Sequence, residues 1–485
     1  MNTLAVDAGT TAVKAAVVDE AGKVCRVSRV MVDRGPDPGI DPEHFWNAVA
    51  RAIAEARGPS TPIDAVTVTG QGDGLWALAD DGTPAGNALE WNSTLAGEII
   101  AEWERNGTIA AHYARSGTVL WSGTTAALWL WAKENHPQIA ADTRHVFYAK
   151  DWINYRLCGA VATDITDATI PFLDVFGGQY DPEGFSFLGC HDLSDAMAPI
   201  APSGTEIGAV TAEAAAITGL PSGTPVLMGS IDVLSMTQGV GVSAPGQAVA
   251  VLGTTAAAMA INDDLDTSGE PVGATLRIHG TEQRFLRVMG ASSGTSTLDW
   301  FLAEFYESAA SAHGSFWADV QASAHGSFWA DVRASAHGVV MLPYLAGERA
   351  PFLAPQATGA FLGITGRTSR ADMAGSVALG ITFSLRHCLE HAAGGVPDTV
   401  VLTGGGASSE AWCQIAADVL GCDVVVDDRP DVACAGVAAI ATGRAIAPPP
   451  QRPTFAPRRD YSTDYREFVE VGNAIRPIWE KMSRQ

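Results

Sequence analysis

The segment from residue 4 to residue 19 constrains the fold more than any other part of the sequence. Leu4 and Val6 begin an apolar run, and apolar residues recur at every second position from Val13 to Val17, which is typical of β-strands. Gly9-Thr10-Thr11 separates the two runs. Because glycine lets the backbone turn sharply, the segment predicts a hairpin of two short strands around a tight turn.

The polar residues of this hairpin suit a phosphate ligand. Asp7 places a carboxylate at the end of the first strand, and Lys14 adds a cation on the second. The turn between them offers backbone N–H groups and two hydroxyls. This set fits a nucleotide phosphate with Mg²⁺. An ordinary hairpin with a Gly-Thr turn is the alternative, and the spacing is not that of a Walker A motif.

Length and composition narrow the class of protein. A chain of 485 residues is too long for one core, so we expect two domains, 1–243 and 244–485. The formal net charge of −24 argues against nucleic acid and anionic membrane as partners. The seven cysteines are scattered without a Cys-x-x-Cys pair, which favours free thiols in a reducing cytoplasm. We see neither a signal peptide nor a membrane-spanning run, and a homodimer is only the prior expectation for the oligomeric state.

A glycine-rich loop follows a predicted buried strand over residues 63–69. The loop, Gly70-Gln71-Gly72-Asp73-Gly74, lies at the carboxyl end of that strand, where ligands bind in open α/β sheets. Gln71 and Asp73 could donate to and accept from sugar hydroxyls, or could belong to a plain polar turn. Trp91 could pack on a carbohydrate or could be a half-buried core residue.

Asp232 stands just past a predicted strand over residues 225–228. A lone carboxylate at this point can act as a general base toward a hydroxyl. It can also cap the helix predicted over residues 233–240, and without other context the residues themselves favour the cap.

The second half of the chain repeats the plan of the first. Gly253-Thr254-Thr255 lies between two apolar strands, as Gly9-Thr10-Thr11 does, which indicates two clefted domains that each present a turn to phosphate. Later, a strand over residues 399–402 ends in Gly404-Gly405-Gly406, before a helix over residues 410–420. A glycine-rich loop before a helix N-terminus suits an anion or an adenosine phosphate.

Taken together, these motifs resemble the FGGY family of carbohydrate kinases over roughly residues 3–445. The resemblance implies an α/β fold of two actin-like (ribonuclease H-like) ATPase domains with an interdomain cleft. It also implies that 1–243 binds sugar and phosphate and that 244–485 binds nucleotide. The matching segments are 7–11 with Lys14, 150–152 with 163–164 and 167–168, 229–232, 253–255, 342–351, and 404–407 with 412–421.

The same resemblance implies roles for individual residues. Asp232 would be the catalytic base, which reverses the preference for a cap, and Asp7 would hold Mg²⁺ through water. ATP would be the phosphoryl donor, bound by Gly9, Thr10, Thr11, Lys14, Gly253, Thr254, Thr255, Gly405 and Gly406. The acceptor would be a small polyol or ketose, bound by Gln71, Gly72, Asp73, Trp91 and Asp232.

Two departures from the family pattern bear on the substrate. Gly-Gln-Gly-Asp-Gly at residues 70–74 resembles erythritol kinases, whereas xylulose kinases have Met-His before the final glycine. Many members have an acidic residue and an Arg after the Trp-Asn pair, but here Ser93, Thr94 and Leu95 follow. We therefore expect a ligand of neutral hydroxyls, erythritol or a related polyol. The alternatives are a xylulose-type ketopentose kinase and, from another class, a non-catalytic actin-like sugar sensor or filament protein.

A 12-residue tandem repeat occupies residues 310–338. Because 12 residues leave a phase shift of about 120° on a helix, one continuous helix cannot keep the repeated Phe-Trp pair on one face. We interpret the repeat as a recent duplication that extends the surface. Solvated loop residues are favoured over metal ligands for His313, His325 and His337. A final helix is predicted over residues 464–482.

Overall fold

The computed structural model of the chain describes residues 2–33, 39–58, 61–280, 283–306, 338–429, 431–444, 446 and 452–482. Two compact units make up the chain. Unit 1 consists of residues 1–243, 262–286 and 429–449, and unit 2 of residues 244–261, 287–428 and 450–485. The tandem repeat with its three histidines, up to residue 337, lies outside the described residues.

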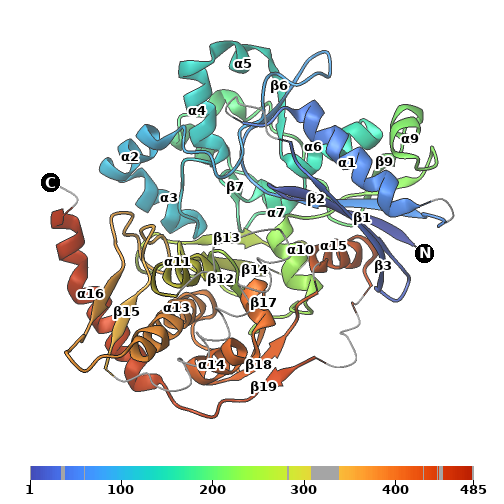
Figure 1. The fold of residues 1–485 in the computed structure, drawn as a ribbon. Coiled ribbons are helices and arrows are strands. Elements are labelled where there is room, and N and C mark those ends of the chain that lie inside the picture. The colour runs from blue at the N-terminus through green and yellow to red at the C-terminus, as the bar shows by residue number, and fades with distance from the viewer. Residues whose placement is uncertain are drawn as a thin grey trace. The chain divides into compact units, whose positions relative to one another are not determined.

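Unit 1 is built on a mixed sheet with the strand order β3-β2-β1-β4-β10-β9 (Figure 1). The predicted hairpin is confirmed as the antiparallel pair β1 and β2, while β1, β4 and β10 run parallel to one another. The strands of unit 1 are β1 (Thr3–Ala8), β2 (Ala12–Val18), β3 (Val24–Met31), β4 (Ala65–Gly70), β5 (Trp76–Ala79), β6 (Thr143–Phe147), β7 (Leu173–Asp174), β8 (Gln179–Tyr180), β9 (Glu206–Ala209), β10 (Pro225–Leu227) and β13 (Ala274–Arg277).

Strand β1 is buried on both faces of this sheet. Leu4 and Val6 belong to the core that also contains residues of helix α1, whereas Ala5 packs in a second core with Val437 of helix α15. Burial on two faces explains why β1 is a continuous apolar run instead of an alternating one. Helix α15 comes from the C-terminal part of the sequence, which the sequence analysis did not anticipate for this unit.

The helices of unit 1 cover this sheet and the segment that follows β5. Helix α1 begins at Pro42, because the Asp41 side chain accepts from the backbone N–H groups of Glu43 and His44 and Pro42 takes the first position. The helices are α1 (Pro42–Arg57), α2 (Gly97–Arg105), α3 (Thr108–Ser116), α4 (Thr125–Asn135), α5 (Pro137–Asp142), α6 (Ala149–Cys158), α7 (Ile165–Ala168), α8 (Pro182–Phe187), the short 3₁₀ helix His191–Leu193, α9 (Ala212–Thr218), α10 (Asp232–Gly239) and α15 (Val432–Thr442).

Unit 2 repeats the same strand plan. Within a seven-stranded sheet, the strands of this unit run in the order β14-β12-β11-β17-β18-β19, with β11 antiparallel to β12 and parallel to β17, and with β17 parallel to β18. The final pair is antiparallel in both units, β10 with β9 and β18 with β19. The predicted repetition of the first half in the second is therefore confirmed as two α/β domains of one strand order.

The predicted C-terminal helix is also confirmed in unit 2, as α16. The elements of this unit are β11 (Ala248–Leu252), β12 (Ala256–Asn262), β14 (Phe285–Gly290), α11 (Thr295–Phe305), β15 (Val340–Leu342), β16 (Ala360–Leu362), α13 (Arg370–Ala393), β17 (Thr399–Thr403), the 3₁₀ helix Gly405–Ser408, α14 (Glu410–Leu420), β18 (Asp423–Val426), β19 (Thr454–Phe455) and α16 (Ser462–Met482). Among the described residues of both units, no helix combines the length and apolarity needed to cross a membrane.

Candidate active site

The parallel strands of unit 1 bring three predicted site segments to one edge of the sheet. Ala8 at the end of β1 is in register with Gly70 at the end of β4, and Gly70 forms a parallel bridge with Ile231 beyond β10. The turn at 9–11, the loop at 71–73 and Asp232 therefore follow the carboxyl ends of three neighbouring strands. This is the edge at which ligands bind in open α/β sheets.

Three charged side chains interact at this edge. Asp7 and Lys14 are directly opposite each other on β1 and β2, with Lys14 Nζ 3.3 Å from Asp7 Oδ2. Burial, with the nearby negative charge of Asp7 adding to its effect, raises the pKa of Asp232 to about 7. Burial also raises the pKa of Asp7, while Lys14 opposes that rise. A carboxyl group with a pKa near 7 can accept a proton at neutral pH, as a general base must.

Asp232 is the first residue of helix α10, and Ile231 takes the N-cap position. The interpretation of Asp232 as the cap is therefore wrong. Two side chains hold the segment before it: the Thr69 hydroxyl donates to the Ser230 carbonyl at 2.7 Å, and the Ile231 N–H donates to Thr166 Oγ1 at 2.9 Å. The tertiary structure thus fixes the start of α10 without a side-chain cap.

A fully buried ionic cluster lies next to Thr166, whose hydroxyl donates to Asp164 Oδ2 at 2.7 Å. Lys150 Nζ lies 2.6 Å from Asp151 Oδ1, 3.0 Å from Asp164 Oδ1 and 2.7 Å from Asp167 Oδ2, and all four side chains are inaccessible to solvent. Burial raises the pKa of Asp167, with the charges of the other two aspartates adding to the effect. These ion pairs therefore hold α6 and α7 together, and Asp164 also caps α7 by accepting from the Thr166 N–H at 3.0 Å.

The loop at 71–73 packs closely against the segment before Asp232. A Cβ at Gly72 would lie 2.1 Å from Ile231 Cδ1, so a side chain has no room there. Asp73 adopts a left-handed backbone with φ of 59°, and its Oδ1 accepts from the N–H groups of Gly74 at 3.0 Å and Thr125 at 2.8 Å. Its side chain is 5% exposed, and Oδ2 has no hydrogen-bond partner among the described residues. Burial raises the pKa of Asp73 to about 7.

Gln71, Thr10 and Trp91 meet in one hydrogen-bonded chain. The Trp91 Nε1–H donates to Thr10 Oγ1 at 3.1 Å, and the Thr10 hydroxyl donates to Gln71 Oε1 at 2.8 Å. Gln71 Nε2 then donates to Glu90 Oε1 at 3.0 Å. Trp91 is half-buried, and its backbone carbonyl accepts from Trp121 Nε1 at 2.8 Å, which holds the main chain at this residue. The structure joins three predicted residues to Glu90, which the sequence analysis missed.

Asp431 adds a further carboxyl group near Asp7 and Lys14. Asp431, which directly precedes α15, is close enough to Lys14 and Asp7 that both act on its pKa, although burial is the larger cause of its rise. The sequence analysis had no signal for Asp431, because it is more than 400 residues away from Asp7 along the chain. Among the described residues, no group of three or more His, Cys, Asp or Glu side chains is arranged to hold a metal ion.

In unit 2, the turn at 253–255 and the loop at 404–406 lie side by side. A Cβ at Gly404 would lie 2.6 Å from the Leu252 carbonyl oxygen, and Gly404 has a φ of 95°, so both space and backbone favour glycine. A Cβ at Gly405 would meet nothing within 4 Å, which leaves this backbone open to a ligand. The predicted nucleotide residues that belong to unit 2 are thus close to one another.

Two further residues of unit 2 support this turn. The Thr295 N–H donates to the Gly253 carbonyl at 2.8 Å, and a Cβ at Gly294 would lie 2.5 Å from that same oxygen. Glu348 Oε1 accepts from the N–H of Ser292 at 2.7 Å and so anchors the segment before Gly294. Burial raises the pKa of Glu348 to about 7. Glu348 was part of a recognised motif, but only the fold shows which segment it holds.

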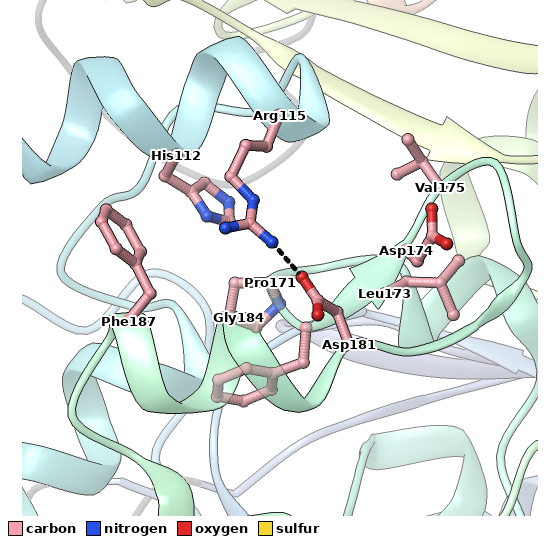
Figure 2. Close-up of a pocket in the computed structure, with 10 residues that line it drawn as sticks. His112, Arg115, Pro171, Leu173, Asp174, Val175, Asp181, Gly184 and Phe187 are labelled. Carbon is pink, nitrogen blue, oxygen red and sulfur yellow. Dashed lines mark hydrogen bonds and ion pairs between the residues drawn. The ribbon is translucent and has the colours of Figure 1, made fainter.

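A cavity of about 190 Å³ lies elsewhere in unit 1, between α3 and α8 (Figure 2). In Figure 2, His112 and Arg115 extend from α3 toward Asp181, which forms an ion pair with Arg115. Burial lowers the pKa of His112 to about 4, with the charge of Arg115 adding to the effect, so the ring is neutral at pH 7. The predicted site residues are not among the residues that line this cavity, which are His112, Arg115, Pro171, Phe172, Leu173, Asp174, Val175, Asp181, Gly184 and Phe187.

Comparison with known families decides the class of the protein. The N-terminal domain model of the FGGY family of carbohydrate kinases matches residues 2–239, and its C-terminal domain model matches residues 248–445. The chain belongs to the FGGY family of carbohydrate kinases. It is therefore a kinase that transfers a phosphoryl group from ATP to a sugar hydroxyl, and a non-catalytic sensor or filament protein is disfavoured.

Individual relatives of this FGGY kinase differ in substrate. The chain is 27% identical over 448 residues to the L-xylulose/3-keto-L-gulonate kinase of Escherichia coli, covering 90% of this chain and 86% of the relative. It is 27% identical over 513 residues to the erythritol kinase of Brucella abortus, covering 99% and 97%. It is 30% identical over 432 residues to the xylulose kinase of Escherichia coli, covering 86% and 84%.

Solved structures share the fold of this FGGY kinase. The gluconate kinase of Lactobacillus acidophilus superimposes with a TM-score of 0.88 at 20% identity, covering 99% of this chain and all of the other. The xylulose kinase of Rhodospirillum rubrum gives a TM-score of 0.87 at 24% identity, with the same coverage. At these identities the likeness establishes the fold, and it leaves the substrate open.

Proposed function

We propose that this FGGY kinase phosphorylates a primary hydroxyl of a small neutral polyol, with erythritol or a related polyol favoured over ketopentoses. The observation that carries this proposal is Asp73 at the tip of the 71–73 loop. Its Oδ2 is buried without a hydrogen-bond partner among the described residues, and at neutral pH it can accept from or donate to a hydroxyl. An erythritol kinase is among the relatives that match nearly the full chain.

Neutral hydroxyls fit the charges of this edge better than a carboxylate does. Asp73, Glu90 and Asp232 all contribute carboxyl groups, and Lys14 is paired with Asp7. A sugar acid would bring a further negative charge to these groups, which costs free energy at short range. A xylulose-type ketose is also uncharged, so it remains the second candidate.

In the mechanism, Asp232 accepts the proton of the attacking hydroxyl as the hydroxyl oxygen forms a bond to the γ-phosphorus of ATP, while the bond from that phosphorus to the bridging β,γ-oxygen breaks and ADP leaves. General-base assistance of this kind contributes about 10²–10⁴ in rate. The turn at 9–11 and Lys14 supply donors and a positive charge for phosphate oxygens, and the residues at 253–255 and 404–406 bind the nucleotide.

The donor set of unit 1 also fits Mg²⁺. Asp7 offers hard carboxylate oxygen beside the phosphate turn, and Mg²⁺ typically uses one or two carboxylates together with waters and substrate phosphates. A cluster of three protein carboxylates is therefore not needed. When bound, the ion would neutralise charge that develops on the transferring phosphoryl group. All seven cysteines are free thiols, which supports our placement of the enzyme in the reducing cytoplasm.

The test is ADP release from ATP and Mg²⁺ in the presence of erythritol, threitol, xylitol, ribitol, D-xylulose and L-xylulose, scored by kcat/KM. We expect a tetritol to give the highest value. The variant Asp232→Asn should keep ATP binding, measured by fluorescence titration, while kcat falls by about 10² or more. A ketopentose that exceeds every polyol would reject the proposed substrate, and near-normal kcat in the variant would remove Asp232 from the mechanism.

A further inference from the structure

Glu90 lies at the end of the hydrogen-bonded chain that begins at Trp91. Its side chain is 4% exposed, and it accepts from Gln71 Nε2 at 3.0 Å. Gln71 is 3% exposed and lies 19 residues earlier in the sequence. Burial of a carboxylate is costly unless donors face it, so the contact with Gln71 is part of what permits Glu90 at this position.

The residues at the two ends of this hydrogen-bonded chain, Trp91 and Glu90, fix the direction of its hydrogen bonds. An indole nitrogen can only donate, so Trp91 must donate to the Thr10 oxygen. A carboxylate can only accept, so Glu90 requires the amide nitrogen of Gln71 on its side. The Gln71 oxygen is then turned toward Thr10, whose hydroxyl donates to it. If the amide flipped, its oxygen would face the carboxylate of Glu90, which is repulsive.

This hydrogen-bonded chain joins two parts of the site that the proposed mechanism uses separately. Thr10 belongs to the phosphate turn at 9–11, and Gln71 belongs to the polyol loop at 71–73. Gln71 Nε2 carries two hydrogens and gives one to Glu90, so the orientation that Glu90 imposes also decides where the second N–H points.

We propose that Glu90 is a positioning residue for polyol binding: it orients the Gln71 amide and, through Thr10, ties the polyol loop to the phosphate turn. This inference rests on the proposed polyol kinase activity. In this inference Glu90 acts through Gln71. Without an acceptor oxygen at residue 90, the Gln71 amide can flip and the loop can move relative to the turn.

Removing the acceptor at residue 90 should weaken the binding of the polyol more than the binding of ATP. We expect Glu90→Met, which keeps an unbranched side chain of similar length but has no carboxylate, to raise the KM for the polyol about tenfold or more. The KM for ATP should change by less than about threefold, because Thr10 still receives the Trp91 donor. ADP release without polyol should rise as a fraction of total turnover, because the turn and the loop are no longer held together.

Two variants serve as controls. Glu90→Gln keeps an acceptor oxygen for Gln71 Nε2 and should restore the polyol KM to within about threefold of the wild-type value. Glu98→Met makes the same change at an exposed glutamate eight positions away in the sequence and should leave all three quantities unchanged. Thermal melting of each variant shows that it is folded, and the wild-type enzyme sets the reference.

The outcomes are distinct. A polyol KM of Glu90→Met equal to that of the wild type overturns the inference, as does an equal loss for polyol and ATP. If Glu90→Met does not fold while Glu90→Gln is normal, the hydrogen-bond acceptor at residue 90 serves stability alone and the inference fails. If the wild-type enzyme shows no polyol-dependent ADP release but accepts a ketopentose, the proposed substrate fails, and the same variants then test Glu90 on the ketopentose.

Discussion

The buried carboxyl group of Asp73 should make the stability of the protein depend on pH, and its removal tests this. The change Asp73→Asn keeps a carbonyl oxygen where Oδ1 accepts from Gly74 and Thr125, and it removes the titratable group. Burial raises the pKa of Asp73 from 3.8 to about 7, so between these values the folded state binds a proton that the unfolded state has released. The free energy of unfolding therefore decreases as pH rises through this window, and the decrease stops above about pH 7.

The magnitude follows from the pKa. One pH unit corresponds to about 1.4 kcal/mol for one proton, so the change from pH 5.5 to about 7 amounts to about 2 kcal/mol. Relative to the wild type, Asp73→Asn should become more stable by about 2 kcal/mol between pH 5.5 and pH 8. This range lies above the sequence pI of about 4.7.

Urea unfolding followed by tryptophan fluorescence measures this difference, because Trp46, Trp76 and Trp152 are all buried in unit 1. Asp80→Asn is the matched control, since the Asp80 side chain is 96% exposed, and it should show no such pH dependence relative to the wild type. If the difference between Asp73→Asn and the wild type is the same at pH 5.5 and pH 8, Asp73 is not the buried acid that the structure indicates.

Three further predictions concern other residues of the two units. Because Asp232 must be ionised to act as a base and its pKa is about 7, kcat/KM should rise about tenfold per pH unit below pH 7 and level off above it; a flat profile from pH 5.5 to pH 8 would contradict this role. Lys150→Met leaves three buried carboxylates without their cation and should lower the free energy of unfolding by about 3–5 kcal/mol in urea, whereas Lys23→Met at an exposed site should change it little. Gly294→Ala places a Cβ 2.5 Å from the Gly253 carbonyl oxygen, so the turn must shift and the KM for ATP should rise about tenfold or more in steady-state assays; an unchanged KM would show that the turn tolerates the shift.

Local patterns in the sequence predicted the elements of both sheets well. The alternation after Val13 and the Gly-Thr-Thr turns each act within a few residues, so their physical cause lies within the segment itself. The repeated strand–turn–strand pattern also predicted that the second sheet copies the first. Family motifs then pointed to Asp7 and Asp232, and the structure brings these two carboxyl groups into one charge network.

The sequence was less informative about which polar residues support the site. Asp232 looked like a helix cap because its neighbours allow one, but long-range contacts from Thr69 and Thr166 hold that segment instead. No local pattern indicated the ion pairs among residues 150, 151, 164 and 167, whose complete burial makes them an internal support. In each case the deciding contact spans more than ten residues, which no local pattern records.

What the sequence alone determined about this protein is its family, its duplicated α/β plan and the two turns that present backbone donors. These depend on residue types at short spacing, where glycine, threonine and apolar alternation have direct conformational effects. The tertiary structure alone decided that Glu90 faces Gln71, that Gly294 lies against Gly253, and that Asp73 loses its contact with water. Those features arise from burial and from distances between remote segments, and both exist only once the chain is folded.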